Sequence, residues 1–352
     1  MKVIKVGMAA FGMSGKVFHG PLIHAHPYLQ LSVVHERSSE NSKEKYPHVQ
    51  VVKDYDALIS DASLELIVVN TPQHLHYEMC KKALEAGKNV VVEKPFTVTT
   101  QEAQDLIRLA KDKKKILAVF QNRRWDGDFL TVQKVIKNNL LGRIVEYETH
   151  FDRFRNYIQE GSWKEEDSLP GAGLLYNLGP HMVDQAICLF GLPESVFADV
   201  RIIRAGGKVD DFFKLILFYE GLRVTISSSY LVREPNPRFI LHGSSGSFIK
   251  YGYDPQEEAL KYGLDPNDEF WGKDNPELWG TLNTEIDGLH FDGNIETIPG
   301  NYMSFYNNVY EAITSGKQLL VNPEDSMYNI TIIEAAFESN NLKKQVPLNF
   351  NY

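Results

Sequence analysis

Short apolar runs alternate with amphipathic stretches along the first 122 residues. The runs at 66–69 and 90–92 contain no polar position, a pattern typical of strands buried on both faces of a parallel sheet. Helical periodicity fills the intervals, for example over 74–86 and over 100–113, where Thr99 and Thr100 supply a cap. Strands are expected at 2–7, 29–35, 49–52, 66–70, 89–92 and 116–120. This alternation predicts an α/β fold with a doubly wound parallel sheet.

The pattern changes after Arg123. A helix is expected over 126–139, and strands then dominate, with a hairpin signal at Glu220-Gly221 between 212–219 and 222–231. Further strands are expected at 143–154, 195–205, 238–242 and 247–253, and further helices at 174–190, 302–314 and 324–338. Residues 254–299 are rich in Pro, Gly, Asp and Asn, and an irregular surface excursion is expected there. The second half therefore predicts a mostly antiparallel open sheet with helices on one side.

A glycine-rich turn follows the first expected strand. The spacing Ala10-x-Gly12-x-x-Gly15 matches the dinucleotide fingerprint, with alanine in place of the first glycine. Gly12 lets backbone approach a pyrophosphate, and the N-terminus of the next helix offers N–H groups to phosphates. An acid, Glu36, follows 21 residues after Gly15. These features predict a nucleotide site formed by Ala10, Phe11, Gly12, Met13, Ser14, Gly15 and Glu36; a purely structural turn is the alternative.

Polar residues follow other expected strands, at the edge where parallel sheets bind ligands. They are Asn70-Thr71-Pro72, Glu93-Lys94-Pro95 and Gln121-Asn122-Arg123. Proline after Lys94 disfavours helical geometry at the lysine. Lys94 is therefore expected at the sheet edge where a nicotinamide would lie, and a surface Lys-Pro turn is the alternative.

A second polar group lies in the segment 176–184. Asn177 and His181 are four apart and His181 and Asp184 are three apart, so on a helix they project from one side. A histidine oriented by a polar neighbour can accept a proton near neutral pH. The alternative is a buried histidine that is hydrogen-bonded for structure.

Together these segments resemble the glucose–fructose oxidoreductase / inositol dehydrogenase (Gfo/Idh/MocA) family over essentially the whole chain. The marks are the turn at 7–15, Asn70-Thr71-Pro72 with His76, the segment 86–95 ending in Glu93-Lys94-Pro95, and Gly179-x-His181-x-x-Asp184. Residues 14–21, 122–126 and 247–252 look like its NADP-dependent scyllo-inositol dehydrogenase branch. The resemblance implies a Rossmann domain over 1–122 and a C-terminal α+β domain over 123–352, with a homodimer or homotetramer formed through the C-terminal sheet.

The resemblance also implies hydride transfer between NAD or NADP and a carbinol carbon of a sugar or polyol. Lys94 would bind the reacting hydroxyl, and His181 would be the catalytic histidine. Asn177 stands where many members carry an aspartate; its amide can orient His181 but holds no negative charge. Cofactor contacts are expected from the turn residues, Glu36, Arg37, Asn70, Thr71, Pro72, His76, Glu93, Lys94, Gln121 and Trp163. Substrate contacts are expected from Lys94, Arg123, Arg153, Tyr176, Asn177 and His181; a contact with the domain linker is the alternative for Arg123, and a solvated strand face is the alternative for Arg153.

Cofactor choice is balanced in the sequence. A carboxylate at Glu36 favours the ribose hydroxyls of NAD and repels the 2′-phosphate of NADP. Arg37 can pair with that phosphate, so dual use is expected. Two other functions stay open: a glycosidase that uses bound NAD for transient oxidation, and a nucleotide-binding regulator without turnover.

Charge and composition argue against several classes of binding partner. The net charge of −9 argues against a nucleic-acid partner, and no apolar run approaches the length of a membrane span. Two distant cysteines and the absence of a visible signal peptide predict a reducing, cytoplasmic location. No metal site is expected, because His74-x-His76 has no third ligand at metal spacing.

Overall fold

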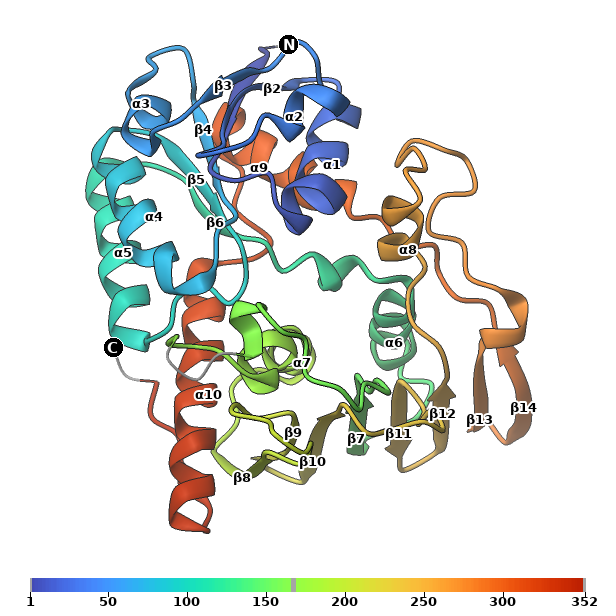
Figure 1. Cartoon of the computed structure of the whole chain (residues 1–352). Helices are drawn as coiled ribbons and strands as arrows, with labels where there is room; N and C mark the ends of the chain where they lie inside the picture. The colour runs from blue at the N-terminus through green and yellow to red at the C-terminus, as the bar shows by residue number, and fades with distance from the viewer. Residues whose placement is uncertain (1, 166–168, 351–352) are drawn as a thin grey trace. The chain divides into compact units, whose positions relative to one another are not determined.

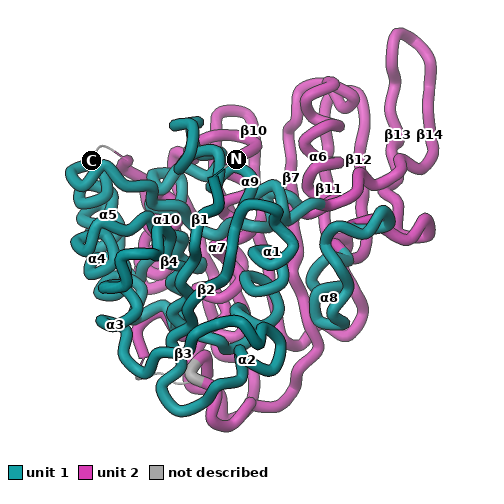
Figure 2. The backbone as a smooth tube through the Cα atoms, turned by 90° about the horizontal axis from the view of Figure 1, so that it is seen from above, with its two compact units in different colours: residues 1–125, 255–271, 301–327 teal, residues 126–254, 272–300, 328–352 magenta. Residues whose placement is uncertain are grey.

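The computed structural model describes residues 2–165 and 169–350, except for the side chain of Trp163. The chain packs as two compact units, each made of three separate segments (Figure 2). Unit 1 contains residues 1–125, 255–271 and 301–327; unit 2 contains 126–254, 272–300 and 328–352. The division into 1–122 and 123–352 stays a prediction about the sequence domains. Packing adds two later segments to the first unit.

Unit 1 is built on a parallel sheet. Its six described strands have the order β3-β2-β1-β4-β5-β6, the order of dinucleotide-binding domains, which reverses between β1 and β4. The strands are β1 (Ile4–Met8), β2 (Leu29–His35), β3 (Gln50–Val52), β4 (Leu66–Val69), β5 (Asn89–Val92) and β6 (Leu117–Val119). β2 and β5 match their predicted bounds, and the others differ by one or two residues at an end.

Helices cover both faces of this sheet. The helices are α1 (Gly20–Ala25), α2 (Asn41–Lys45), α3 (Tyr55–Ser60), α4 (His76–Glu85), α5 (Thr100–Lys113), α8 (Gln256–Lys261) and α9 (Met303–Ser315), with short turns η2 (Gln73–Leu75) and η3 (Asn122–Trp125). Figure 1 shows α4 and α5 on one face and α1 and α9 on the other. The side chains of α9 join the core formed by β1 and α1, so a segment far along the chain completes this unit.

The helix after the glycine-rich turn begins irregularly. Residues Gly15–His19 form a single π-helical turn, η1, in which the N–H of Gly20 bonds to the carbonyl of Gly15. α1 starts directly afterwards, with Pro21 in its first turn. Proline has no N–H to donate, so it cannot continue the preceding helical hydrogen-bond pattern. The local sequence therefore sets a wide turn immediately after the nucleotide fingerprint.

Unit 2 is built on a larger, mixed sheet. Its nine described strands have the order β14-β13-β12-β11-β7-β10-β9-β8-β15, in which only β7 and β10 pair in parallel. They are β7 (Ile144–His150), β8 (Ser195–Arg201), β9 (Phe212–Tyr219), β10 (Leu222–Ser229), β11 (Phe239–Gly243), β12 (Gly246–Lys250), β13 (Gly280–Ile286), β14 (Leu289–Ile295) and β15 (Val346–Pro347). The remaining elements are α6 (Gly127–Lys137), η4 (Trp163–Glu165), α7 (Leu174–Phe190), η5 (Pro276–Leu278) and α10 (Pro323–Leu342). The predicted fold class is confirmed.

The expectation of an irregular excursion over 254–299 is wrong. This segment contains α8 and the hairpin β13–β14, which extends the sheet of unit 2. Asp287 and Gly288 connect the two strands, with φ values of 49° and 77°. A type I′ hairpin turn requires positive φ values at both of its central residues, and Asp-Gly is a favoured pair there. The pair was therefore a sequence signal for this hairpin, but the polar residues around it obscured it.

Candidate functional site

The glycine-rich turn is fixed to the end of β4 by one side chain. Asn70 accepts a hydrogen bond from the N–H of Ala10 at 3.0 Å, and its amide nitrogen donates to the carbonyl of Ala10 at 2.8 Å. This two-point contact joins the two strands on either side of the position where the strand order reverses. Asn70 therefore acts on the predicted nucleotide turn by holding its backbone.

The geometry of the turn fits a dinucleotide. A Cβ added at Gly12 would meet no atom within 4 Å, whereas one added at Gly15 would lie 2.7 Å from the carbonyl oxygen of Ala10. Gly15 is therefore needed for internal packing, and Gly12 faces open space. The N–H groups of Met13 and Ser14 have no acceptor in the described part of the chain. Open space and unused N–H donors at the start of a helix are what a pyrophosphate requires.

Glu36 organises the loop that follows β2. Its carboxylate accepts hydrogen bonds from the hydroxyl of Ser39 at 2.6 Å and from the N–H groups of Asn41 and Ser42 at 3.0 and 2.9 Å. Burial opposes ionisation, but these hydrogen bonds outweigh it and hold the pKa of Glu36 below its usual value. Glu36 thus caps α2, while Arg37 is exposed.

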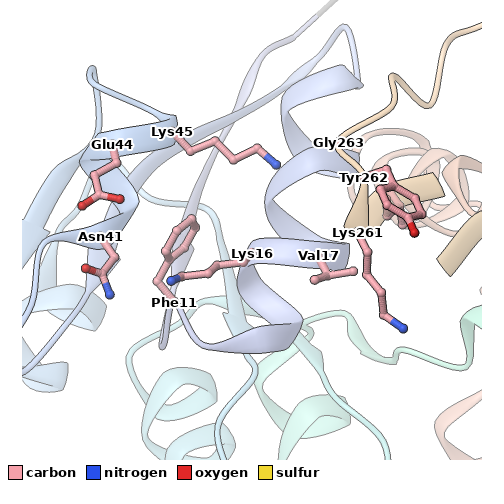
Figure 3. A pocket seen from close by; sticks show the side chains of 10 residues that line it. Phe11, Lys16, Val17, Asn41, Glu44, Lys45, Lys261, Tyr262 and Gly263 are labelled. Atoms are coloured by element: carbon pink, nitrogen blue, oxygen red, sulfur yellow. The ribbon is translucent and has the colours of Figure 1, made fainter. Parts of the chain in front are cut away.

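A cavity of about 530 Å³ borders this loop and the turn (Figure 3). Its lining residues come from the glycine-rich turn, η1, α2, α8 and the two residues after α8, and are Phe11, Lys16, Val17, Asn41, Glu44, Lys45, Leu260, Lys261, Tyr262 and Gly263. In Figure 3 Lys16 extends along Phe11, and the amine of Lys45 points toward the helix that carries Val17. Three lysines and one glutamate give this side of the nucleotide turn a positive character.

Lys94 lies at the carboxyl end of β5, next to a buried polar chain. Its N–H donates to Glu93 at 3.0 Å, and the other carboxylate oxygen of Glu93 is 3.0 Å from Nε2 of His19. Nδ1 of His19 is 2.6 Å from the hydroxyl of Tyr306 on α9. Burial opposes ionisation of Glu93, but the hydrogen bond and charge interaction with His19 outweigh it and lower the pKa of Glu93.

His76 joins two loops at the same edge of the sheet. Its ring nitrogens lie 2.9 Å from the carbonyls of Thr71 and Pro95, and the side chain is buried. Burial lowers the pKa of His76. His76 thereby links the loop after β4, which contains Pro72, to the loop that carries Lys94. Gln121, beyond β6, is buried as well.

His181 lies on α7, whose start is capped by a distant acid. Asp210 accepts a hydrogen bond from the N–H of Leu175 at 2.6 Å, and its carbonyl accepts from Leu174 at 2.8 Å. Burial raises the pKa of Asp210 to about 6. Along the helix, His181 and Asp184 are both buried. Gln185 accepts a hydrogen bond from the buried Arg238 at 2.9 Å, which fixes α7 on its sheet.

Asn177 and Tyr176 have partners within unit 2. The ammonium of Lys164, in η4, donates to the amide oxygen of Asn177 at 3.1 Å. The ring of Tyr176 stacks on Phe337 of α10, with centroids 5.8 Å apart. Asn177 is therefore next to a cation, a neighbour that an aspartate would also attract.

The predicted residues Arg123 and Arg153, and Arg124 next to the first, make contacts within their own units. Arg123 pairs with Glu257 of α8 at 2.5 Å, and Arg124 contacts Asp325 and the carbonyl of Leu320. The guanidinium of Arg153 lies over the ring of Phe151. The predicted contact from the Trp163 side chain lies outside the described residues. The roles of these residues toward substrate or cofactor stay predictions.

Sequence reasoning overlooked four residues that organise these sites: His19, Tyr306, Lys164 and Asp210. Only His19 carried a signal, because it follows Gly15 by one helical turn and lies inside the segment 14–21 that marks the resemblance. Tyr306 lies on a helix that was predicted, but sequence does not say which sheet that helix meets.

The described residues contain neither a cluster of metal-ligating side chains nor a helix suited to cross a membrane. Over residues 2–165 and 169–350, no three His, Cys, Asp or Glu side chains are grouped so that they could hold a metal ion. Within the same ranges, no helix combines the length and the apolar character that crossing a bilayer requires.

Two family models cover most of the chain. One, described as oxidoreductase family, NAD-binding Rossmann fold, matches residues 4–121; the other, oxidoreductase family, C-terminal alpha/beta domain, matches residues 133–348. This chain belongs to the Gfo/Idh/MocA oxidoreductase family. The predictions of an oxidoreductase and of a nicotinamide dinucleotide cofactor are thereby confirmed for this Gfo/Idh/MocA member.

Relatives within the Gfo/Idh/MocA family match this chain over nearly its full length or over about two thirds of it. The scyllo-inositol 2-dehydrogenase (NADP(+)) IolW of Bacillus subtilis is 40% identical over 98% of this chain and 96% of the relative. The levoglucosan dehydrogenase of Pseudarthrobacter phenanthrenivorans is 26% identical over 67% of this chain and 65% of its own. Among solved structures, yvaA from Bacillus subtilis has 39% identity and a TM-score of 0.95, with 99% of both chains covered. A Bacteroides fragilis protein has 49% identity and a TM-score of 0.91, with 99% of this chain and 100% of that chain covered.

Proposed function

We propose that this oxidoreductase interconverts a secondary alcohol and a ketone on a cyclic polyol or sugar of the inositol type. The turn from Ala10 to Gly15 would hold NAD(P)⁺, which would supply the acceptor for the hydride lost from the alcohol carbon, while a side chain of this protein takes the proton from the alcohol oxygen. The observation that carries the proposal is the position of Lys94. This residue follows β5 at the ligand-binding edge of a dinucleotide-binding sheet, and its N–H donates a hydrogen bond to Glu93. The names of the relatives support the substrate class.

In this proposal Lys94 polarises the reacting oxygen and stabilises negative charge that develops on it. His181 accepts the hydroxyl proton, as histidine can near neutral pH. Asn177 lies one helical turn from His181, adds no charge of its own there and accepts a hydrogen bond from the ammonium of Lys164. Substitution of Lys94 and of His181 tests these two roles separately.

We further propose that NADP is accepted at least as well as NAD. The carboxylate of Glu36 is engaged by Ser39, Asn41 and Ser42, which leaves less capacity to bind ribose hydroxyls. Arg37 is exposed on the same loop, and a guanidinium can hold a phosphate with two hydrogen bonds. Lys16 and Lys45 add positive charge in the adjoining cavity.

The deciding experiment incubates the pure protein with NAD⁺ or NADP⁺ and a panel of inositols, hexoses and glycosides. Net formation of reduced cofactor with an inositol or a hexose supports the dehydrogenase. Glycoside cleavage without net reduction identifies the glycosidase instead. Cofactor binding, measured by calorimetry, without either reaction identifies a regulator and overturns the proposal.

We also propose a cytoplasmic homodimer or homotetramer that assembles through the sheet of unit 2. Exposed apolar side chains on β8 and on the hairpin β13–β14, such as Phe197, Leu289 and Phe291, support a covered surface. The protein has two cysteines, Cys80 and Cys188, and their small number and wide separation in the sequence support a reducing compartment. Light scattering at micromolar concentration tests the assembly, and a monomer would contradict it.

A further inference from the structure

A hydrogen-bonded chain of polar side chains lies inside an apolar core of unit 1. It consists of Tyr306, His19 and Glu93. His19 and Tyr306 have no exposed surface, and Glu93 is 9% exposed. The His19 ring packs 4.4 Å from the ring of Phe120. Burying a carboxylate in such surroundings costs free energy unless it is fully paired, and apolar side chains of similar size would often serve stability as well. Fold stability alone therefore does not account for these three residues.

The ionised carboxylate of Glu93 can only accept hydrogen bonds, so Nε2 of His19 carries a proton and donates to it. Nδ1 of His19 shares the second hydrogen bond with the hydroxyl of Tyr306, and which of these two atoms donates follows the protonation of the ring. Burial raises the pKa of Tyr306 well above its usual value, so the hydroxyl keeps its proton. The hydrogen-bonded chain thus ends at the carboxylate of Glu93, whose second oxygen accepts a hydrogen bond from the N–H of Lys94.

We propose that His19 and Tyr306 are positioning residues for Lys94, acting through the carboxylate of Glu93. Their hydrogen bonds keep Glu93 ionised and in one orientation, which fixes the backbone at Lys94 and sets a constant negative charge close to its ammonium. This role rests on the proposed function of Lys94. The titratable groups that act on Glu93 within unit 1 are His19, Lys94, His76 and Tyr306.

The first test uses Tyr306→Phe, which removes a single oxygen. Its matched control is Tyr310→Phe, because Tyr310 lies on the same helix and donates its hydroxyl to the carbonyl of Lys2, away from Glu93. We expect Tyr306→Phe to lower kcat by about tenfold, equivalent to about 1.4 kcal/mol of transition-state stabilisation, with the dissociation constant for NADP unchanged. Tyr310→Phe should leave kcat unchanged. A larger loss is expected for His19→Gln, because its flexible amide can reach Glu93 only from the position of Nε2 and offers no group in place of Nδ1, so Tyr306 loses its partner.

The second test needs no substrate. Acylation of the Lys94 amine by a succinimidyl ester is followed by peptide mass spectrometry between pH 7 and 9, with Lys113 as the internal reference. Glu93→Gln removes the negative charge, which favours the neutral and reactive amine, so Lys94 should acylate several times faster. Tyr306→Phe should move the rate in the same direction by less.

The outcomes separate this inference from the proposed function. If the wild-type protein oxidises no polyol but the variants change Lys94 acylation, the proposed function fails and the positioning role stands. If the wild-type protein is a dehydrogenase and folded Tyr306→Phe and Glu93→Gln proteins keep both its kcat and its Lys94 acylation rates, the positioning role is wrong. If His19→Gln does not fold, the Tyr306→Phe and Glu93→Gln variants decide whether the positioning role is correct.

Discussion

The ammonium of Lys164 donates a hydrogen bond to the amide oxygen of Asn177, with 3.1 Å between the two atoms. An aspartate at 177 would form an ion pair at the same place. The Asn177→Asp variant is therefore expected to fold and stay active. Its acid limb in the pH–rate profile should move to higher pH, because a new carboxylate one helical turn from His181 favours the imidazolium. The shift should grow in the double variant with Lys164→Met. Asn177→Ser, which adds no charge, serves as the control, and identical profiles for all three would contradict a link between residues 177 and 181.

Lys94 and His181 should be separable from cofactor binding. We expect Lys94→Met to abolish most turnover and His181→Gln to cost about 10²–10⁴-fold in kcat, the range of a lost general base. The dissociation constant for NADP should stay within about threefold of wild type, a difference of less than 1 kcal/mol. Lys113→Met, at the exposed end of α5, controls for a general loss of charge. Wild-type kcat in either site variant would remove that residue from the mechanism.

Gly12 and Gly15 should fail in different ways when changed to alanine. A methyl group at Gly12 meets no atom of the protein, so the free energy of unfolding should change by less than about 0.5 kcal/mol. It occupies the space expected for the pyrophosphate, and affinity for NADP should fall by about tenfold or more. A methyl group at Gly15 would lie 2.7 Å from the Ala10 carbonyl, and we expect about 1–3 kcal/mol of destabilisation. Urea unfolding and calorimetry measure both effects; equal behaviour of the two variants would refute this division.

Arg37 and Glu36 should affect cofactor use differently. Arg37→Ala should lower kcat/KM for NADP by about tenfold and leave NAD unaffected, because it removes a charged hydrogen bond to the 2′-phosphate. Glu36→Gln should lower kcat/KM for both cofactors, since it disturbs the hydrogen bonds that hold Ser39, Asn41 and Ser42. The ratio of kcat/KM values is the measurement. A rise in NADP use alone after Glu36→Gln would mean that the carboxylate repels the phosphate directly.

His150 should make stability fall at alkaline pH. It lies between Glu148 and Asp152, and although burial opposes its charge, the hydrogen bonds to Asp152 and Glu148 outweigh burial and raise the pKa of His150 to about 9. Because this value lies above the unfolded value of 6.5, the stabilisation is complete below pH 6.5 and is lost as pH rises through about 9.

Between pH 6.5 and 9.5 the free energy of unfolding of the wild-type protein should fall by up to about 3 kcal/mol more than that of His150→Gln. Denaturant unfolding of the two proteins at matched ionic strength checks this difference. Parallel pH profiles would show that the ion pairs contribute nothing to stability.

The elements of the parallel sheet follow from local pattern. In an unbroken apolar run such as Leu66–Val69, every side chain is buried when helices cover both faces of the sheet. Thr99 and Glu102 form the capping box that begins α5 at its predicted residue. The fingerprint from Ala10 to Gly15 was also a local signal, because the steric limits on its glycines are set by residues close to them in the sequence. Sequence therefore determined the fold class and the place of the nucleotide turn.

Long-range contacts decided the rest. The partner of His19 is Tyr306, and the cap of the helix that carries His181 is Asp210; neither pairing leaves a periodic trace in the sequence. Glu36 occupies the position of a ribose-binding acid, yet it accepts its hydrogen bonds from Ser39 and from the first turn of α2. A side chain's type limits what it can bind, but its partner depends on which segments the fold brings within 3 Å, and only the tertiary structure specifies that.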